Sequence, residues 1–266
     1  MSPTLAELRA TPHLSVAQLK TFIQCPRKYF LQYIERAAPS HRSAALAFGS
    51  AWHSTIDEWL INSSQDAPVP NAELHEVFKA ALEQELLREG PPVLFDDDQE
   101  DLGRLVGTGM RMVDAFVRAV PLPAKVIGVE IPFGLTLVDP TTGEVLPVPL
   151  IGSIDALVVE GGETSLWELK SGKRRWSSDQ VEYDLQPTAY VQAARELGEE
   201  PDAVKLIVAT KSSQPDIQVE RLVRRRSDEE DLFATAASVV RGVHAGVDHP
   251  VRSWSCRTCP YTGACR

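Results

Sequence analysis

The segment that most constrains the fold is residues 151–172, which read IGSIDALVVEGGETSLWELKSG. Two strand-like runs flank the dipeptide Gly161-Gly162. Strand-like runs joined by a tight glycine turn predict a β-hairpin. The hairpin brings Asp155, in the first strand, beside Glu168, in the second. The chain is therefore expected to contain a sheet with two acidic side chains on neighbouring strands.

The second strand of this hairpin also carries a lysine. Side chains two residues apart in a strand share a face, so Glu168 and Lys170 point together while Leu169 points into the core. With Asp155, this places two carboxylates and an amine at one edge of the sheet. Carboxylate oxygens suit Mg²⁺ or Mn²⁺, and a nearby lysine stabilises developing negative charge. The alternative is a surface hairpin with a salt-bridged Glu–Lys pair.

The rest of the chain predicts a mixed α/β core. Ser15 and Gln18 form a capping-box pair that starts a helix, and Pro26 either ends that helix or begins the next. Residues 46–120 have helical spacing, whereas residues 124–212 read as strands with one helix near Gln186. The predicted parts are an N-terminal helical segment, a core with a helical insertion, and a cysteine-rich tail. Their bounds are 1–45, 46–245 with the insertion at about 62–122, and 246–266.

The formal net charge of −10 argues mildly against a general polyanion binder, but local basic strips are enough to follow a phosphate backbone. The sequence holds two such strips, the second of which is equally well explained as a solvated face. They are Lys170, Lys173, Arg174 and Arg175, and Arg221, Arg224, Arg225 and Arg226. Acidic residues gather elsewhere, at Asp96, Asp97, Asp98, Glu100 and Asp101.

The sequence contains no apolar run of the roughly 20 residues that a membrane helix needs, and its N-terminus does not read as a secretory signal. A cytoplasmic location without membrane attachment is therefore expected. The G-x-x-x-x-G-K-[ST] loop of a nucleotide-driven motor is also absent. The chain is thus not itself a helicase motor.

The chain has only four cysteines, Cys25, Cys256, Cys259 and Cys265. The last three form a C-x2-C-x5-C pattern, with one remote partner. Disulfides are uncommon in the cytosol, whereas four thiolates can hold zinc or an iron–sulfur cluster. Unconnected free thiols are the third reading.

Four motifs occur in the order of a known family: Phe48-Gly49-x3-His53, Gly152-Ser153-Ile154-Asp155, Glu168-Leu169-Lys170 and Gln186-x3-Tyr190. With them, the sequence resembles the RecB-like branch of the PD-(D/E)xK nuclease superfamily from about residue 15 onward. It departs at Ser171-Gly172, where the family usually has Thr-Gly. The resemblance implies a restriction-endonuclease-like α/β fold with a mixed central sheet flanked by helices.

The resemblance also implies roles for individual residues. A two-metal-type site for Mg²⁺ or Mn²⁺ would use His53, Asp155, Glu168 and the Leu169 carbonyl, with Lys170 as the catalytic lysine. Gln186 and Tyr190, four apart on one helix face, would lie over the DNA backbone near the metal. His53 could instead be a core histidine between Trp52 and Ile56, and Tyr190 could be plain core. Glu130 could approach the site, although a strand-end glutamate is more often exposed.

For the cysteines, the resemblance extends to the iron–sulfur members of this branch, the AddB-type helicase–nuclease subunits and the CRISPR-associated RecB-like exonucleases. It implies a [4Fe-4S] cluster that staples residue 25 to residues 256–265. Such a staple would stabilise the native state by ligand binding. Loss of any one cysteine is then expected to destabilise the fold.

The activity implied by the resemblance is a DNA exonuclease acting on single-stranded ends, in repair, recombination, phage or CRISPR-related processing. Lys173, Arg174 and Arg175 would contact phosphates, and Trp176 or Trp167 could stack a base, with Trp167 the better candidate for core packing. A helicase, recombination or CRISPR-adaptation partner is compatible with this reading. The competing hypotheses are a catalytically weak DNA-end-binding partner of a helicase or integrase, and a zinc-ribbon adaptor.

Overall fold

The computed structural model describes residues 3–63, 67–95 and 101–265. The acidic run of Asp96, Asp97, Asp98 and Glu100 lies outside these described residues, while Asp101 caps the helix that follows by accepting a hydrogen bond from the Arg104 amide at 2.8 Å.

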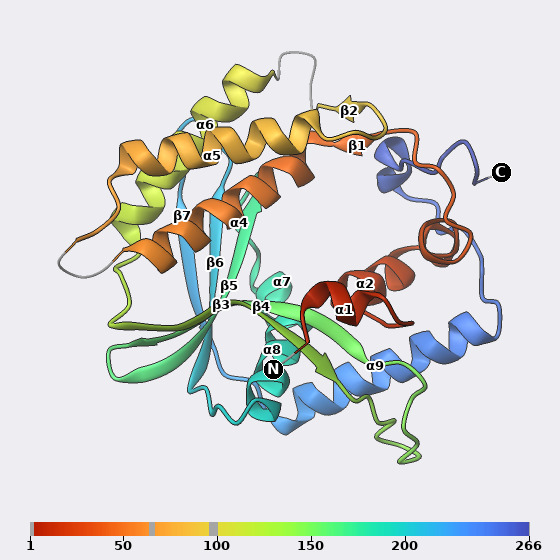
Figure 1. Ribbon diagram of the computed structural model, residues 1–266. Helices are drawn as coiled ribbons and strands as arrows, with labels where there is room; N and C mark the ends of the chain where they lie inside the picture. Colours follow the sequence, from red (N-terminus) through yellow and green to blue (C-terminus); the bar gives the residue numbers. More distant parts are fainter. Residues whose placement is uncertain (1–2, 64–66, 96–100, 266) are drawn as a thin grey trace. The chain divides into compact units, whose positions relative to one another are not determined.

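A five-stranded sheet is the centre of the fold (Figure 1). Its strands lie in the order β3-β4-β5-β6-β7. The β4–β5 and β6–β7 pairs are antiparallel, whereas β5 and β6 are parallel. The strand bounds are β3 Lys125–Leu135, β4 Leu150–Glu160, β5 Glu163–Gly172, β6 Ala203–Thr210 and β7 Ile217–Leu222. This mixed sheet with flanking helices confirms the predicted α/β fold class.

The predicted hairpin is formed by β4 and β5. Gly161 and Gly162 have φ values of 56° and 84°, a left-handed backbone that glycine adopts without steric cost and that suits a two-residue hairpin turn. The pairing runs to Ala156 opposite Trp167, so the next residues along the two strands are Asp155 and Glu168. Both strands are interior strands, so the expectation that these side chains meet at a sheet edge is wrong.

The chain forms two compact units, here called unit 1 and unit 2. Unit 1 consists of residues 1–42, 132–153 and 225–266, and unit 2 of residues 43–131 and 154–224. Strands β3 and β4 pass from one unit to the other. The three-part division predicted from the sequence stays a prediction.

In unit 2, three helices pack on one face of the sheet: α4 (Ala44–Asn62), α5 (Asn71–Leu87) and α6 (Leu102–Ala119) (Figure 1). Their core contains Trp59 stacked on Trp167, with ring centroids 6.5 Å apart, so Trp167 packs in the core and not against a base. Helices α7 (Ser178–Glu182) and α8 (Leu185–Glu196) follow β5, and α8 contacts β5 and β6.

Unit 1 contains α1 (Leu5–Arg9), α2 (Val16–Gln24), α3 (Pro26–Tyr29), a π-helix η1 (Phe30–Ile34), α9 (Arg226–His244) and a 3₁₀ turn η2 (Trp254–Thr258). The Ser15 hydroxyl accepts from the Gln18 amide at 3.2 Å, which is one half of the predicted capping box; among the described residues the Gln18 Oε1 has no partner. Pro26 begins α3, where its missing N–H costs nothing. Two strands of two residues each, β1 (Arg42–Ser43) and β2 (Val93–Leu94), form a separate sheet.

Sequence patterning misses β7, because charged residues interrupt its apolar positions. Gln218, near its start, is buried; its side chain accepts from the Trp176 amide and donates to the Trp176 carbonyl, at 2.8 and 3.1 Å. Patterning also misses α1 and α7, which have five residues each. Over the described part of the chain, no helix is long and apolar enough to cross a bilayer.

Candidate active site

The candidate site opens into a cleft of about 610 Å³ in unit 2. One wall is the face of α4 that carries His53 and Asp57; the other comes from Glu130 on β3 and from Leu169 and Lys170 on β5. Gly49, one turn before His53, also lines the cleft, and a Cβ there would reach only ordinary contact with Ser171 Oγ, at 3.7 Å.

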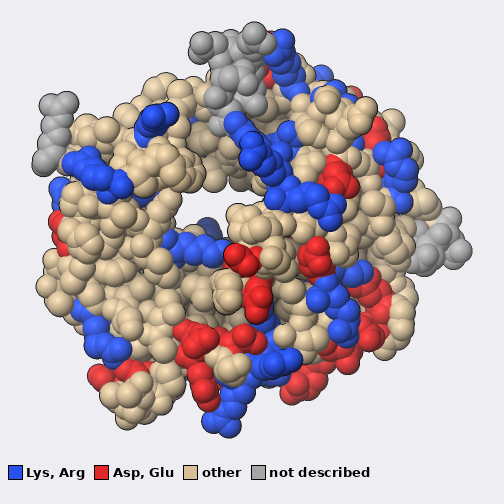
Figure 2. All heavy atoms as spheres, turned by 180° about the vertical axis from the view of Figure 1, so that it is seen from behind, with Lys and Arg blue, Asp and Glu red and all other residues tan. Residues whose placement is uncertain are grey.

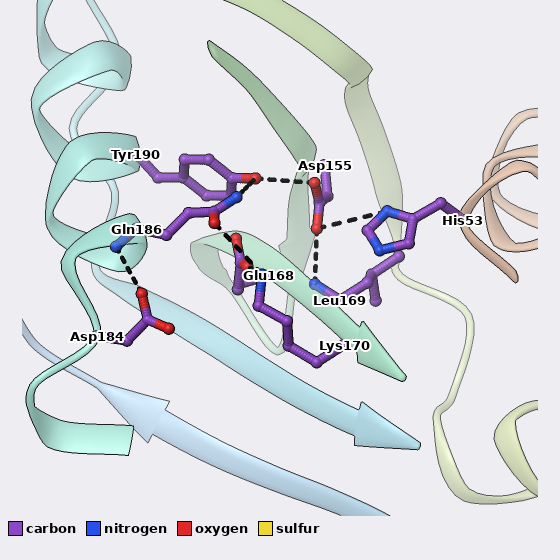
Figure 3. A network of polar contacts seen from close by, with 8 residues as sticks. All are labelled: His53, Asp155, Glu168, Leu169, Lys170, Asp184, Gln186 and Tyr190. Carbon is purple, nitrogen blue, oxygen red and sulfur yellow. Dashed lines mark hydrogen bonds and ion pairs between the residues drawn. The ribbon is translucent and has the colours of Figure 1, made fainter. Parts of the chain in front are cut away.

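Asp155 is held from two sides (Figure 3). Its Oδ2 accepts a hydrogen bond from the Leu169 amide at 2.7 Å, which ties β4 to β5. Its Oδ1 accepts from the Tyr190 hydroxyl at 2.8 Å, which ties the carboxylate to α8. Two short hydrogen bonds to one buried carboxylate fix its orientation before any ligand arrives. Position 152 of the same strand favours glycine, because a Cβ there would lie 2.6 Å from the Phe133 ring.

Gln186 and Tyr190 extend this network along α8. The Lys170 ammonium donates to Gln186 Oε1 at 3.3 Å, and Gln186 Nε2 donates to the Tyr190 hydroxyl at 2.8 Å. The N-terminus of α8 is capped by Asp184, which accepts from the Gln186 amide at 2.8 Å. Tyr190 is 1% exposed, so it lies beneath the site, supporting Asp155, and not on the surface where a DNA backbone would pass.

Glu168 and Lys170 form an ion pair on the face they share. Glu168 is fully buried, and apart from this ion pair neither of its oxygens has a hydrogen-bond partner among the described residues. Burial raises the pKa of Glu168, against the opposing effect of Lys170. Burial alone would lower the pKa of Lys170, but Glu168 and Asp155 outweigh it and raise this pKa. Lys170 is therefore a cation in the site.

His53 faces the cleft, whereas its neighbours Trp52 and Ile56 are fully buried. Its Nδ1 lies 3.9 Å from Asp155 Oδ2, and burial and Lys170 lower its pKa. A lowered pKa keeps the imidazole neutral, which is the form that binds metals. His53 is therefore not a buried core histidine.

Glu130 lies much closer to the site than its sequence position suggests. Ligand atoms of Glu130, His53 and Asp155 all fall within 4.8 Å of one another. The residue stands in the middle of β3, not at a strand end, and has a φ of 48°. Left-handed backbone at a non-glycine residue is strained, and here it accompanies a carboxylate beside two other candidate ligands.

Asp57 is a site residue that the sequence analysis missed. It lies one turn after His53 on α4 and lines the same cleft. Its Oδ1 is buried and has no hydrogen-bond partner within the described ranges. Burial, reinforced by Glu130 and Asp155, raises its pKa from 3.8 to about 8. The sequence signal that could have identified Asp57 is the His53-x3-Asp57 spacing, which places both side chains on one helix face.

The two basic strips are largely engaged within the protein. In the first strip, Lys173 and Arg174 are exposed, while Arg175 pairs with Asp216. In the second, Arg221 pairs with Glu163, Arg224 donates to the Val181 and Asp184 carbonyls, and Arg226 pairs with Glu230. On the face drawn in Figure 2, Lys and Arg side chains alternate with Asp and Glu. The second strip is therefore better described as a solvated, paired surface.

The four cysteines come together in unit 1, where they line one small cavity with Leu31 and Val251. All four are free thiols of intermediate exposure. The Val251 amide donates to Cys25 Sγ at 3.4 Å, across 226 residues of sequence. Cys256 Sγ donates to the Val251 carbonyl at 3.9 Å. The fold thus collects the remote cysteine and the three tail cysteines at a single point.

A mixed sheet that carries an aspartate and a Glu-x-Lys pair on adjacent strands defines a class of nuclease folds. The chain belongs to the PD-(D/E)XK nuclease superfamily, whose family model matches residues 13–266. It is similar to a crystal structure described as "Putative exonuclease" from Eubacterium rectale, with 16% identity, a TM-score of 0.54, and coverage of 97% of this chain and 93% of that one. A second structure, SSO0001, covers 94% of each chain at 12% identity and a TM-score of 0.40. A comparison with curated protein sequences gave no match.

Proposed function

We propose that this chain is a metal-dependent deoxyribonuclease of the RecB-like branch, which hydrolyses single-stranded DNA from an end. The observation that carries the proposal is that His53 and Lys170 line one cleft, in a chain that belongs to a nuclease superfamily. Behind them, Asp155 Oδ2 lies 3.9 Å from His53 Nδ1, and Glu168 pairs with Lys170. The similar structure from Eubacterium rectale is described as a putative exonuclease, which supports the choice of an exonuclease.

The donor set fits a divalent cation with a preference for oxygen ligands. Apart from the ion pair with Lys170, the two buried oxygens of Glu168 lack hydrogen-bond partners among the described residues. His53, Asp155 and Glu130 hold ligand atoms within 4.8 Å of one another. His53, Asp155, Glu168 and the Leu169 carbonyl would hold Mg²⁺ or Mn²⁺, with Glu130 and Asp57 as additional acidic groups. Such an ion, when bound, would lower the pKa of a water molecule and offset charge on the phosphate.

Lys170 would act on the reacting phosphate itself. Its ammonium is kept charged by Glu168 and Asp155 and is aimed by its hydrogen bond to Gln186. A preorganised cation in a partly dry site stabilises negative charge that develops in the transition state. Gln186 and Tyr190 would serve as positioning residues, because they orient Lys170 and Asp155 through hydrogen bonds.

The DNA path beside the site would use the exposed Lys173 and Arg174. Arg175 would contribute only after releasing Asp216, so we assign it the weaker phosphate contact. Trp176 is half-buried and packs on a cluster with Val181 and Leu206, which limits its surface for stacking. Such an activity would serve in DNA repair, recombination, phage or CRISPR-related processing in the cytoplasm. Its partner there would be a helicase, recombination or CRISPR-adaptation protein.

We further propose that Cys25, Cys256, Cys259 and Cys265 hold a [4Fe-4S] cluster. Supporting observations are the shared cavity and the free state of all four thiols. Thiolates are the usual ligands of such clusters, and ligation would tie together segments far apart in the sequence. Iron and sulfide analysis of protein purified without oxygen, together with its colour, tests this assignment. A colourless protein that contains zinc and no iron would contradict it.

The deciding experiment for the nuclease proposal uses end-labelled single-stranded and double-stranded DNA with Mg²⁺, Mn²⁺ or chelator. Wild type is expected to shorten the single strand from an end in the presence of metal. Lys170→Ala is expected to lose this cleavage, because the phosphate charge is no longer offset, while Lys173→Ala loses only part of its DNA affinity. Equal cleavage by wild type and Lys170→Ala would refute the mechanism.

A further inference from the structure

Trp254 differs from the other tryptophans of the chain in its exposure. Of the five tryptophans, Trp52, Trp59 and Trp167 are fully buried and Trp176 is half-buried, whereas Trp254 is 82% exposed. An indole in water forgoes the large gain that burial of its ring would bring. Trp167 and Trp176, the two expected to stack on a base, pack within the protein. Trp254 is therefore the tryptophan that is available to a ligand.

The segment around this tryptophan is basic, although the whole chain has a net charge of −10. Residues 249–265 contain Arg252 and Arg257 and no aspartate or glutamate, and both arginines are exposed. The acidic residue just before this segment, Asp248, forms an ion pair with Arg27 at 2.7 Å. An exposed indole between two arginines suits a polyanion that carries flat rings, because guanidinium groups pair with phosphates while a ring stacks on the indole.

The turn that carries Trp254 is held by hydrogen bonds. The Ser253 hydroxyl caps η2 by accepting from the Ser255 amide at 3.3 Å. The Thr262 hydroxyl donates to the Cys256 carbonyl at 3.0 Å. A backbone that is fixed before binding loses little further entropy when a ligand covers its side chain. The indole is thus presented from a preformed turn.

We propose that Trp254, Arg252 and Arg257, here called the tryptophan platform, bind a single-stranded nucleic acid. A base stacks on the indole, and the phosphates on either side of it pair with the two arginines. The choice of nucleic acid as ligand rests on the proposed nuclease function. The platform belongs to unit 1, whereas the residues of the cleft belong to unit 2. It is therefore a contact in addition to those of the cleft.

The platform favours single strands over duplex, because bases inside a duplex are already stacked on both faces. Little sequence preference is expected, since every base has a face that can stack on an aromatic ring.

The test measures tryptophan emission and the affinity for oligo-dT in chelator, so that no strand is cut. Because the other four tryptophans are buried or half-buried, quenching by a stacked base reports mainly on Trp254. Wild type is expected to be quenched on binding. Trp254→Ala is expected to bind about tenfold more weakly, as for the loss of one stacked base. Trp254→Phe, which keeps a smaller ring, is expected to bind more tightly than Trp254→Ala but without quenching.

Tyr183→Ala is the matched control. Tyr183 is 74% exposed, but it lies between Glu182 and Asp184, whose carboxylates repel phosphate. This variant is expected to bind oligo-dT and to be quenched like wild type. Thermal melting and metal content are measured on every variant, so that a loss of affinity is compared only between folded proteins with the same metal content.

A second measurement examines the phosphate contacts. Arg257→Gln is expected to lower the slope of log Kd against log salt by about 0.7, which is the contribution of one phosphate contact on a single strand. An unchanged slope would remove Arg257 from the platform.

Equal affinity of wild type and Trp254→Ala for oligo-dT, or binding by wild type without quenching, would overturn the proposal. A dimer that forms without DNA and is lost in Trp254→Ala, measured by sedimentation, would also overturn it, because a second copy of the chain would then cover the indole. Wild type that is quenched by oligo-dT but cleaves no DNA in Mg²⁺ or Mn²⁺ would uphold the platform and refute the nuclease proposal.

Discussion

The catalytic cleft and the four-cysteine cavity are built in different ways. Around Asp155, side chains from two interior strands and α8 are fixed by hydrogen bonds of 2.7 and 2.8 Å. Around the cysteines, half-exposed thiols are brought together by irregular segments, with sulfur contacts of 3.4 and 3.9 Å. The candidate cleft is therefore preorganised by short hydrogen bonds, whereas the contacts around the thiols are longer. The two sites should respond differently when their residues are changed.

The largest effect on cleavage with the smallest cost in stability is expected from Glu168→Gln. The variant loses one carboxylate ligand, and cleavage should fall by about 10³-fold or more. Its melting temperature without metal should stay close to that of wild type, because removing the buried carboxylate charge and losing its ion pair with Lys170 act in opposite directions. Cleavage rate and thermal melting, measured on the same preparation, check both. A melting temperature that falls steeply would mean that the cleft is not preorganised.

The opposite behaviour is expected of Cys259→Ala. Loss of one thiolate should remove the bound cluster and lower the melting temperature by about 5–10 °C, which corresponds to a few kcal/mol in a chain of this size. Cleavage should decline only as a consequence of unfolding. Thr258→Ala, one residue away, is the control and should melt like wild type. Full thermal stability in Cys259→Ala would show that the cysteines do not support the fold.

A smaller effect is expected from Tyr190→Phe, which removes the hydroxyl that donates to Asp155 and accepts from Gln186. Cleavage should fall by about tenfold, and the free energy of unfolding by about 2 kcal/mol, since two buried hydrogen bonds of about 1 kcal/mol each are lost. The affinity for DNA in chelator should not change, because this ring is buried. Tyr183→Phe, at an exposed tyrosine, is the matched control. Weaker DNA binding by Tyr190→Phe would instead assign the residue to the DNA path.

The last prediction concerns pH and the metal-free protein. Asp57 has a pKa raised from 3.8 to about 8, so its contribution to stability is complete below about pH 4 and is lost as the pH rises towards 8. Metal-free protein should therefore melt at a higher temperature at pH 5.5 than at pH 8.5. Asp57→Asn should reduce this difference. An unchanged pH dependence of the melting temperature in Asp57→Asn would show that burial does not raise the pKa of Asp57.

The strand-borne part of the site could be predicted because period-two alternation fixes which side chains share a face. Asp155, Glu168 and Lys170 meet as expected, and Leu169 and Trp167 are buried as expected. The sheet position was not predictable, since a local pattern does not show that β3 lies beside β4 and β6 beside β5, which makes β4 and β5 interior strands.

Residues that reach the site through tertiary packing were harder to predict: Asp57 was missed, and Glu130 was only the weaker candidate. Asp57 lies at the site because α4 packs on β5. Glu130 lies there with a left-handed backbone conformation that the sequence pattern does not predict. The pairing of Arg175 with Asp216 spans 41 residues, so a run of basic residues overstated the charge available for DNA. Tyr190 lies next to Asp155, as expected, but it is buried beneath the carboxylate and not over a DNA backbone. Helix spacing alone does not distinguish a buried supporting residue from a surface residue.

The separation of Cys25 from its tail partners has a consequence for synthesis. Cys25 and Val251, which contact each other, are 226 residues apart. At the usual 5–20 residues per second, a ribosome needs roughly 10–45 s to add the intervening chain. All residues of the catalytic cleft emerge within that interval, whereas the last thiols follow afterwards. The residues of the candidate site are thus synthesised first, and insertion of the proposed cluster would be among the last maturation steps.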